Sequence, residues 1–412
     1  MPISSSLWAI QFKFTKILKM VEFTLLFGMP SQDRVDRRTF TKLAGAGALA
    51  GMAGCLGGDE EPSVRPMEVE SIPTDEYEDS LHIWNWYVQW VEWGAERFEE
   101  EYPDVSTTVD AYSQPSQWYS QIQGGNHEID SVGTTAEWVD RAMSNDFLEP
   151  LPVDRMPNWE NIDDQFKEPV LEHFSGDDGG VYALPHSMSV FPTLVYNENN
   201  FDSPPTSWDI LWDDEYEDRM ALMAHYSAAV CQVGALYTGQ DPNDPDDFED
   251  IREALIQQKP LNLTYGDEHE THMQMFINED IDVGTHTSGR INMANYLHDG
   301  DHVSWTIPEE GAVYTTDLLA VPTNAPNPRA NLNFLNFMLS DEALEEFVRV
   351  FAYKTPLEDL EEKVRGKEGI PDALVDDILW DDEMMERLHW ARPLDQDVQE
   401  RYDEIWTEVQ AA

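Results

Sequence analysis

Apolar positions follow two periods that alternate along the chain between residues 80 and 143. Short apolar or alternating runs predict strands at 81–86, 105–109 and 130–133. Between and after them, apolar residues at helical spacing predict helices at 91–102, 117–123 and 137–143. This strand–helix alternation favours an α/β fold, with a parallel sheet covered by helices on both faces.

The pattern continues through the second half of the chain. It predicts an extended run at 190–196 and strands at 220–223, 281–284 and 318–322. It predicts helices at 227–237, 248–255, 331–339 and 341–351. The region that follows residue 55 is too long for one typical core, so we expect two lobes.

Acidic residues dominate the charge of the chain. There are 81 Asp and Glu against 25 Lys and Arg, and the formal net charge is −56. This balance repels nucleic acid and anionic lipid, so we expect neither as a partner. The chain is 41% hydrophobic and has 14 Trp, which is enough for a core and argues against a disordered acidic protein. At about 1 M salt the Debye length is roughly 3 Å, so such a surface indicates a protein of an extreme halophile.

An export signal precedes the fold. Arg37 and Arg38 stand ahead of a run of small apolar residues at 43–54 that ends at Cys55. A membrane-spanning helix needs roughly 20 strongly apolar residues, so this short run predicts a twin-arginine signal. The small residues before Cys55 resemble a lipobox, which predicts cleavage and lipidation at this cysteine. The mature protein would then sit at the outer face of the cytoplasmic membrane, or in a space equivalent to the periplasm.

Two further segments flank this signal. Residues 1–28 lie upstream of it, so either Met29 is the true start or these residues form an amphipathic lead. Residues 56–76 are polar and contain Gly, Pro and Ser, which predicts a linker. The chain has two cysteines, and with Cys55 lipidated Cys231 has no partner for a disulfide. Because Cys231 lies in an apolar run, we expect a buried, inert thiol.

A series of short motifs follows in order over residues 80–360. They are Trp84-Asn85-Trp86, Ile129-Asp130-Ser131-Val132, Tyr182-Ala183-Leu184-Pro185, Val195-Tyr196-Asn197, Pro205-Thr206-Ser207-Trp208-Asp209-Ile210-Leu211-Trp212, Gly284 with Ser288-Gly289, Asp317-Leu318-Leu319-Ala320-Val321-Pro322, Asn333-Phe334-Leu335-Asn336-Phe337 and Tyr353-Lys354-Thr355-Pro356. Together they resemble the spermidine/putrescine-binding proteins, which are extracellular solute receptors of ABC importers.

The resemblance implies a two-lobed fold of the type II periplasmic binding proteins, with the ligand in a cleft between the lobes. It implies lobe 1 over 77–187 and 313–355, and lobe 2 over 188–312 and 356–412. The expected partners are a small-molecule solute and the ABC permease subunits at the membrane, and we expect a monomer. No cofactor and no metal are expected.

The resemblance also implies which residues contact the ligand. It places Asn85, Trp86 and Tyr87 at the end of the first strand, where a Trp face attracts an ammonium by about 0.5–2 kcal/mol. Thr135 takes the position of a hydroxyl residue, and Glu137 replaces an aromatic residue and would pair with an amine.

Three more positions come from the chain that re-enters the first lobe. Asp317 matches the carboxylate that binds an amine, which makes it the strongest candidate for that contact. Thr315 replaces an aromatic residue two positions earlier, and Tyr353 matches the hinge-side tyrosine.

The second lobe departs from the family pattern. Two acidic positions are here Tyr226 and Ala229, and a tryptophan position is Thr287. A long polycation would leave its far ammonium unpaired, at a cost of several kcal/mol. A short diamine, a mono-cation such as a quaternary amine, or a zwitterion fits better than spermidine. Within the same receptor fold a betaine, an amino acid, a sugar or ferric iron remain open, the last because of Tyr226.

Other chemistry finds less support in the residues. His269 and His272 are three positions apart, which is not the zincin spacing, and a solvated helix start is the simpler interpretation. A secreted hydrolase that uses two carboxylates is the alternative from another class, but no pair stands out among 81 acids. We find no nucleophile elbow, P-loop or dinucleotide fingerprint, so the sequence favours a binding protein over an enzyme.

Overall fold

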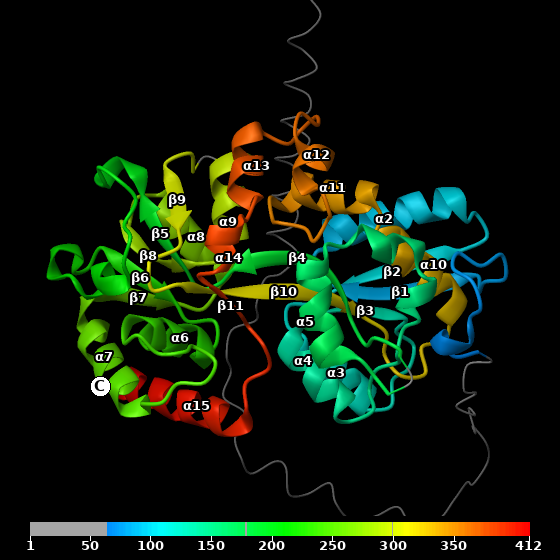
Figure 1. Cartoon of the computed structure of the whole chain (residues 1–412), viewed down its shortest axis with the longest axis horizontal. Coiled ribbons are helices and arrows are strands. Elements are labelled where there is room, and N and C mark those ends of the chain that lie inside the picture. The colour runs from blue at the N-terminus through cyan, green and yellow to red at the C-terminus, as the bar shows by residue number, and fades with distance from the viewer. Residues whose placement is uncertain (1–63, 178, 299) are drawn as a thin grey trace, which may run out of the picture. The chain divides into compact units, whose positions relative to one another are not determined.

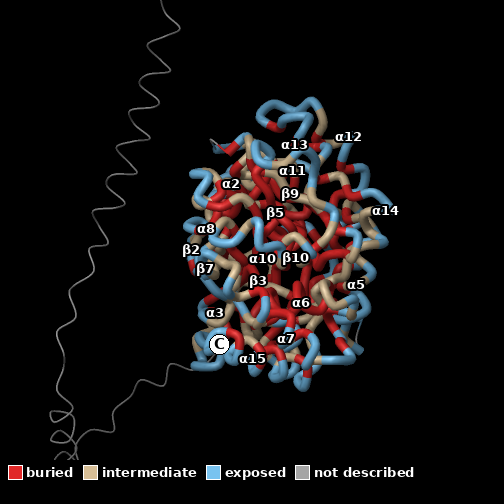
Figure 2. Tube along the Cα trace, turned by 90° about the vertical axis from the view of Figure 1, so that its left-hand side faces the viewer, coloured by how far each residue is buried: buried red, intermediate tan, exposed pale blue. Residues whose placement is uncertain are grey.

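The computed structural model describes residues 64–177, 179–298 and 300–412. These residues build two lobes, each around its own sheet, and two strands pass between the lobes (Figure 1). Buried positions follow the inner strands, whereas exposed positions follow the outer loops and helices (Figure 2). The predicted two-lobed α/β fold is therefore confirmed.

Lobe 1 is built on a mixed sheet with the order β11-β10-β3-β1-β2, and β4 pairs with β10 as well. β1 is parallel to β2 and β3, as the strand–helix alternation predicts, whereas β10 is antiparallel to β3 and β4. The strands are β1 (Ser80–Asn85), β2 (Ser106–Ala111), β3 (Ser131–Thr135), β4 (Leu184–Val190), β10 (Ala312–Ala320) and β11 (Leu388–Trp390).

Helices cover this sheet because each has one apolar face. On α2 the residues Trp90, Val91 and Phe98 are buried at helical spacing, and the helix ends just before Pro103. Ser340 caps α11 by accepting from the Ala343 amide, at 3.2 Å. The helices are α2 (Val88–Glu101), α3 (Ser116–Gln123), α4 (Ala136–Met143), α5 (Asp164–Phe174), α10 (Pro328–Met338), α11 (Asp341–Phe351), α12 (Leu360–Val364) and α13 (Asp372–Ile378).

Lobe 2 is built on a second sheet, with the order β7-β6-β8-β5-β9. Its strands are β5 (Thr193–Asn197), β6 (Met220–Met223), β7 (Asn262–Gly266), β8 (Val283–His286) and β9 (Val303–Thr306). Its helices are α6 (Ser227–Tyr237), α7 (Phe248–Gln258), α8 (His269–Ile277), α9 (Ser288–Asn292), α14 (Asp382–Met385) and α15 (Gln396–Ala411). α6 is buried over most of its length because apolar residues surround its axis, and it packs against α7 and α15.

Short 3-10 turns join these elements at Pro66–Glu68, Val153–Arg155, Pro157–Asn161, Glu198–Asn200, Trp208–Trp212, Asp214–Tyr216 and Lys259–Leu261. α9 continues directly into a π-helical turn at Met293–Leu297.

The two crossing strands belong to both hydrophobic cores. On β10, Val313 and Tyr314 pack in the lobe 2 core, whereas Leu318 and Leu319 pack in the lobe 1 core. On β4, Leu184 belongs to lobe 1 and Val190 to lobe 2. The middle residues of both strands therefore lie where the lobes meet, and we call this region the junction.

Two segments pack elsewhere than the expected lobe boundaries place them. Leu360 to Ile378, expected in lobe 2, contribute Leu360, Val364, Leu374 and Val375 to the lobe 1 core. Val69 and Ile72, expected in a linker, are 5% exposed and join the same core. Both segments bury apolar side chains against lobe 1, and the polar residues around these side chains conceal the pattern in the sequence.

Candidate functional site

Four polar side chains gather on one face of the crossing strands. Thr315 and Asp317 are two positions apart on β10, and they are the only residues of this strand that are not fully buried. Thr315 pairs with Ser189, and Asp317 pairs with Ser187, both on β4. Because directly paired residues share a face, these four side chains lie together at the junction.

Thr135 extends this row across a third strand. It is the last residue of β3 and pairs with Asp317 from the side opposite to β4. Glu137 follows in the first turn of α4 and is partly open to solvent. Burial of its carboxyl group raises the pKa of Glu137; the Arg141 charge lowers it and the Asp403 charge raises it. Since Asp403 lies on α15 of lobe 2, Glu137 faces the second lobe.

Only one oxygen of the Asp317 carboxylate is used by the protein. The Tyr87 hydroxyl donates to Oδ2 at 2.6 Å, and the Ser187 hydroxyl donates to the same oxygen at 3.2 Å. Within residues 64–412 as described, Oδ1 accepts no hydrogen bond, and it is not a buried atom, so it remains open to solvent. Burial raises the pKa of Asp317 to about 6, against the two hydrogen bonds and the Arg290 charge.

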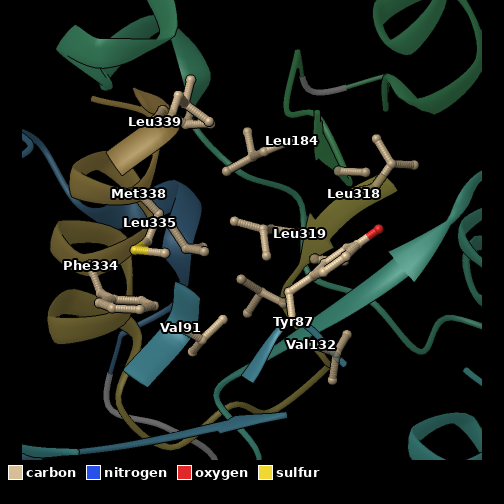
Figure 3. Packing of buried hydrophobic residues seen from close by; sticks show 14 of the residues in the cluster. Tyr87, Val91, Val132, Leu184, Leu318, Leu319, Phe334, Leu335, Met338 and Leu339 are labelled. Carbon is tan, nitrogen blue, oxygen red and sulfur yellow. The ribbon is translucent and has the colours of Figure 1, made fainter. Parts of the chain in front are cut away.

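Aromatic rings stand beside this carboxylate on the lobe 1 side. The Trp86 ring lies 5.8 Å from the Tyr87 ring and 5.4 Å from the Tyr112 ring, between centroids. Trp86 is partly exposed, whereas Tyr87 is 4% exposed. Figure 3 shows the Tyr87 ring near Leu319, with its hydroxyl oxygen pointing away from Met338 and the other side chains of α10.

Asn85 supports these rings, which we call the aromatic wall (Trp86, Tyr87 and Tyr112), through a hydrogen bond to the backbone. Its side chain is fully buried, and its Oδ1 accepts from the Tyr87 amide at 2.8 Å. A Cβ atom at Gly133 would lie 2.7 Å from Asn85 Nδ2, so β3 needs a glycine opposite this amide. Asn85 therefore fixes the turn that presents Trp86 and Tyr87.

On the lobe 2 side, Tyr226 is the exposed aromatic residue. It precedes α6, is 39% exposed, and its ring lies 5.6 Å from Phe191. Burial raises the pKa of Tyr226, and the charges of Glu137 and Asp317 raise it further. Tyr226 therefore faces the carboxylates of lobe 1 although it belongs to lobe 2.

Thr287 and Tyr353 flank the short helix α9. Thr287 is 7% exposed, and its amide donates to His286 Nδ1 at 2.7 Å. The Tyr353 ring covers Gly289, where a Cβ atom would lie 2.3 Å from the ring. The centroid of the Tyr353 ring lies 5.9 Å from the centroid of the Tyr87 ring, so Tyr353 connects α9 with the aromatic wall of lobe 1.

Arg290, the residue after Gly289, brings a positive charge to the same place. Burial raises the pKa of Tyr353 and the Arg290 charge opposes this rise, so the two groups are close. The same charge lowers the pKa of Asp317. No carboxylate oxygen of the described residues lies within 4.0 Å of the Arg290 guanidinium, which leaves it without an ion pair. Sequence reasoning missed Arg290; its signal is a basic residue within a buried run of an acidic chain.

Histidines line the lobe 2 side behind Arg290. His269 and His272 lie on α8, and each ring centroid is 5.3 Å from that of His286. Burial lowers the pKa of His272 to about 4 and that of His269 to about 3, so both are neutral at pH 7. The interpretation as a solvated helix start is wrong for His272, which is 1% exposed. Among the described residues, no group of three or more His, Cys, Asp and Glu side chains could hold a metal ion.

Cys231 lies in the lobe 2 core as predicted. It is buried and unpaired, and burial raises the pKa of its thiol. The expected export arginines Arg37 and Arg38, the lipidated Cys55 and the question of residues 1–28 lie outside the described residues. Within the described part of the chain, no helix is long and apolar enough to cross a membrane.

A surface hollow also lies in lobe 2, lined by Pro205, Thr206, Ser207, Asp209, Ile210, Asp213 and Tyr216. None of the junction residues lines it, and it has no unpartnered cation or aromatic wall of the kind found at the junction. We therefore place the candidate site at the junction.

A family comparison shows to which proteins the chain is related. The model of the bacterial extracellular solute-binding proteins matches residues 93–371. The chain belongs to this family. It is a family of solute-binding receptors and not of enzymes.

Curated relatives share low identity over most of the chain. The spermidine/putrescine-binding periplasmic protein 1 of Haemophilus influenzae is 22% identical over 81% of this chain and 89% of its own length. The putrescine-binding periplasmic protein PotF of Escherichia coli is 25% identical over 64% of this chain and 74% of its own length.

A solved structure shows the same fold. The spermidine/putrescine ABC transporter substrate-binding protein PotD of Streptococcus pneumoniae aligns with a TM-score of 0.69 at 21% identity. The alignment covers 81% of this chain and 99% of that chain.

Proposed function

We propose that this protein is the solute receptor of an ABC importer and binds a small amine-containing solute at the junction. The observation that carries the proposal is that the described protein groups donate hydrogen bonds to only one oxygen of the Asp317 carboxylate. Tyr87 and Ser187 donate to its Oδ2, while Oδ1 accepts no hydrogen bond from the described residues. The partly exposed Trp86 ring lies 5.8 Å from the Tyr87 ring, between centroids. A carboxylate oxygen next to an aromatic face is the combination that an ammonium group prefers.

The energetics of Asp317 favour a cationic ligand. Burial raises its pKa to about 6, which means that the protein destabilises the ionised form. An ammonium on Oδ1 would compensate for the lost solvation by a charge-assisted hydrogen bond. Two curated relatives, a spermidine/putrescine-binding protein and a putrescine-binding protein, support an amine as the recognised group.

The crossing strands suggest how binding is transmitted. β4 and β10 connect the two cores, so a ligand that contacts both Asp317 and Tyr226 would favour approach of the lobes. We propose that the closed form then docks on the permease subunits and releases the solute to them.

The targeting signals in the sequence add a location to the proposal. We propose export through the Arg37-Arg38 signal and lipid anchoring at Cys55. The mass of the N-terminal peptide of the native protein tests the anchor, because a lipidated Cys55 adds acyl chains and an uncleaved precursor does not.

The acidic surface supports operation in concentrated salt. With a net charge of −56, self-repulsion is strong at low ionic strength and is screened in multimolar KCl. We expect the melting temperature to rise steadily with KCl; a melting temperature independent of KCl would contradict the halophilic origin.

The proposed ligand class is tested by thermal shift in multimolar KCl. The panel holds putrescine, spermidine, ω-amino acids, glycine betaine, choline, short sugars and ferric iron. A solute that binds only the folded state raises the melting temperature by mass action. We expect shifts with amines, and loss of these shifts in Asp317→Asn. A shift with a sugar or iron alone, or turnover of a substrate, would contradict the proposal.

A further inference from the structure

The junction holds a positive charge that an amine receptor does not need. Arg290 lies on α9 next to Gly289, which the Tyr353 ring covers, and in the described residues no carboxylate lies within 4.0 Å of its guanidinium. Burial lowers the pKa of Arg290, but nearby groups, among them Glu270 through its charge and Tyr353 through a hydrogen bond, raise it above its usual value. One tyrosine partner leaves most of the N–H donors of an arginine free for other groups, and a ligand is the simplest partner for them.

Arg290 and Asp317 share their surroundings but do not neutralise each other. The Tyr87 hydroxyl donates to Asp317 Oδ2, and the Tyr87 ring lies 5.9 Å from the Tyr353 ring, which covers the base of Arg290. Both charges therefore act on the same two tyrosines. Asp317 has one open oxygen, and the guanidinium has open donors, so each offers binding capacity to a third molecule.

The acidic residues nearby act on this charge from a distance: the charge of Glu270 raises the pKa of Arg290, but no carboxylate oxygen of the described residues lies within 4.0 Å of its guanidinium. Glu270 lies on the exposed surface of α8, and Gln274 donates to it at 3.5 Å. Glu137 lies across the junction and is influenced by Arg141 and Asp403. A dication with one ammonium on Asp317 would bring its second ammonium toward Arg290, where like charges repel.

We infer that the ligand is a zwitterion: its ammonium binds Asp317, and its carboxylate binds the Arg290 guanidinium through paired N–H donors. The inference rests on the proposed function and narrows its ligand class from amines to ω-amino acids or molecules of the same charge pattern. The positive lobe 2 side and the negative lobe 1 side would then be joined by one ligand molecule.

A matched pair of probes tests this inference. 4-Aminobutyrate and putrescine have chains of the same length and the same ammonium, and they differ in the group at the other end, which is a carboxylate in the first and a second ammonium in the other. Titration calorimetry in multimolar KCl, extended to ω-amino acids and diamines of other lengths, measures both affinities. We expect the best ω-amino acid to bind at least about tenfold more tightly than the diamine of equal length.

Variants of Arg290 supply the second readout. We expect Arg290→Gln to weaken ω-amino acid binding by roughly 30-fold or more, because truncating one partner of a close charge pair has effects of this size. The same variant should strengthen diamine binding, because it removes a positive charge near the second ammonium. Arg290→Lys should recover part of the loss. Arg252→Gln, on α7 of the same lobe and paired with Glu249, is the matched control and should change neither affinity. Ligand-free melting curves check that each variant folds.

The outcomes separate the inference from the function on which it rests. If diamines bind more tightly than every ω-amino acid and Arg290→Gln changes neither affinity, the inference of a zwitterionic ligand is wrong. The proposed function as an amine receptor would remain. If no amine binds the folded protein at all, both are wrong.

Discussion

The two sides of the junction carry opposite chemistry. The lobe 1 side presents Trp86, Tyr87 and the open oxygen of Asp317. The lobe 2 side presents Tyr226 and Arg290, which has a hydrogen bond with Tyr353 but no ion pair among the described residues. The carboxylate is fixed on a long central strand, and the guanidinium is fixed on a five-residue helix that Tyr353 covers. If the proposed ligand binds across the junction, each lobe would recognise one of its ends, so a substitution on one side should affect the recognition of one end only.

The largest effect is expected on the lobe 1 side. Asp317→Asn removes the negative charge but keeps the shape, so the ligand ammonium loses its ion pair. We expect every amine to lose affinity by about 100-fold, since removing one partner of a partly buried charge pair costs roughly 2–5 kcal/mol. Calorimetry measures the loss. Asp140→Asn, the same change on the exposed face of α4, is the control and should bind like the unmodified protein.

A second buried carboxylate sharpens this prediction. Burial also raises the pKa of Asp130 to about 6, but both of its oxygens are used: Oδ1 accepts from the Asn327 amide, and Oδ2 accepts from the His82 amide and Asn327 Nδ2. Asp130→Asn should lower stability and leave amine affinity unchanged. Equal loss of affinity in both variants would show that Asp317 acts only through the fold.

The next effect is a loss of amine affinity at low pH. Because burial raises the pKa of Asp317 to about 6, its carboxyl group becomes protonated below that pH and no longer attracts an ammonium. We expect the dissociation constant to be flat above pH 7 and to rise about tenfold per pH unit below about 6. Calorimetry from pH 4.5 to 8 measures this. The dependence should vanish in Asp317→Asn; a dependence that persists there would place the titrating group elsewhere.

A smaller effect is expected from the aromatic wall. Trp86→Leu removes the ring next to Tyr87, which donates to Asp317. We expect affinity for amines to fall by about 2- to 30-fold, which corresponds to roughly 0.5–2 kcal/mol. Trp93→Leu is the matched control, since Trp93 is also partly exposed but stacks on Phe337 outside the junction. Equal losses in the two variants would argue against a role of Trp86 in the site.

The smallest effect concerns the protein without ligand. A carboxyl group whose pKa is raised by folding costs nothing below its unfolded pKa, and its cost appears as pH rises through the folded value of about 6. Asp317→Asn should therefore raise the melting temperature by about 2 °C at pH 7 and by almost nothing at pH 4. Calorimetric melting curves at both pH values measure it. A lower melting temperature at pH 7 would show that the hydrogen bonds to Oδ2 outweigh the burial of charge.

Much of the fold follows from local pattern. The alternation of apolar periods over 81–143 predicted the three parallel strands and three helices that the structure has there, because side-chain spacing reflects backbone geometry within a few residues. β4 was not predicted as a strand of its own, since Pro185 and the polar residues Ser187 and Ser189 interrupt its apolar pattern. α12 and α13 were expected in the wrong lobe because polar residues surround their few buried side chains.

By itself the sequence determined the acidic charge, the α/β class and the motifs that implied Trp86, Tyr87 and Asp317 as ligand contacts. The tertiary structure alone decided which of Asp317's oxygens stays open, which serines stand beside it, and that Arg290 shares its site. The neighbours of Asp317 depend on strand pairing between residues more than a hundred positions apart, such as Asp317 with Ser187, and the position of Arg290 depends on how α9 packs against β4. No local periodicity encodes such contacts.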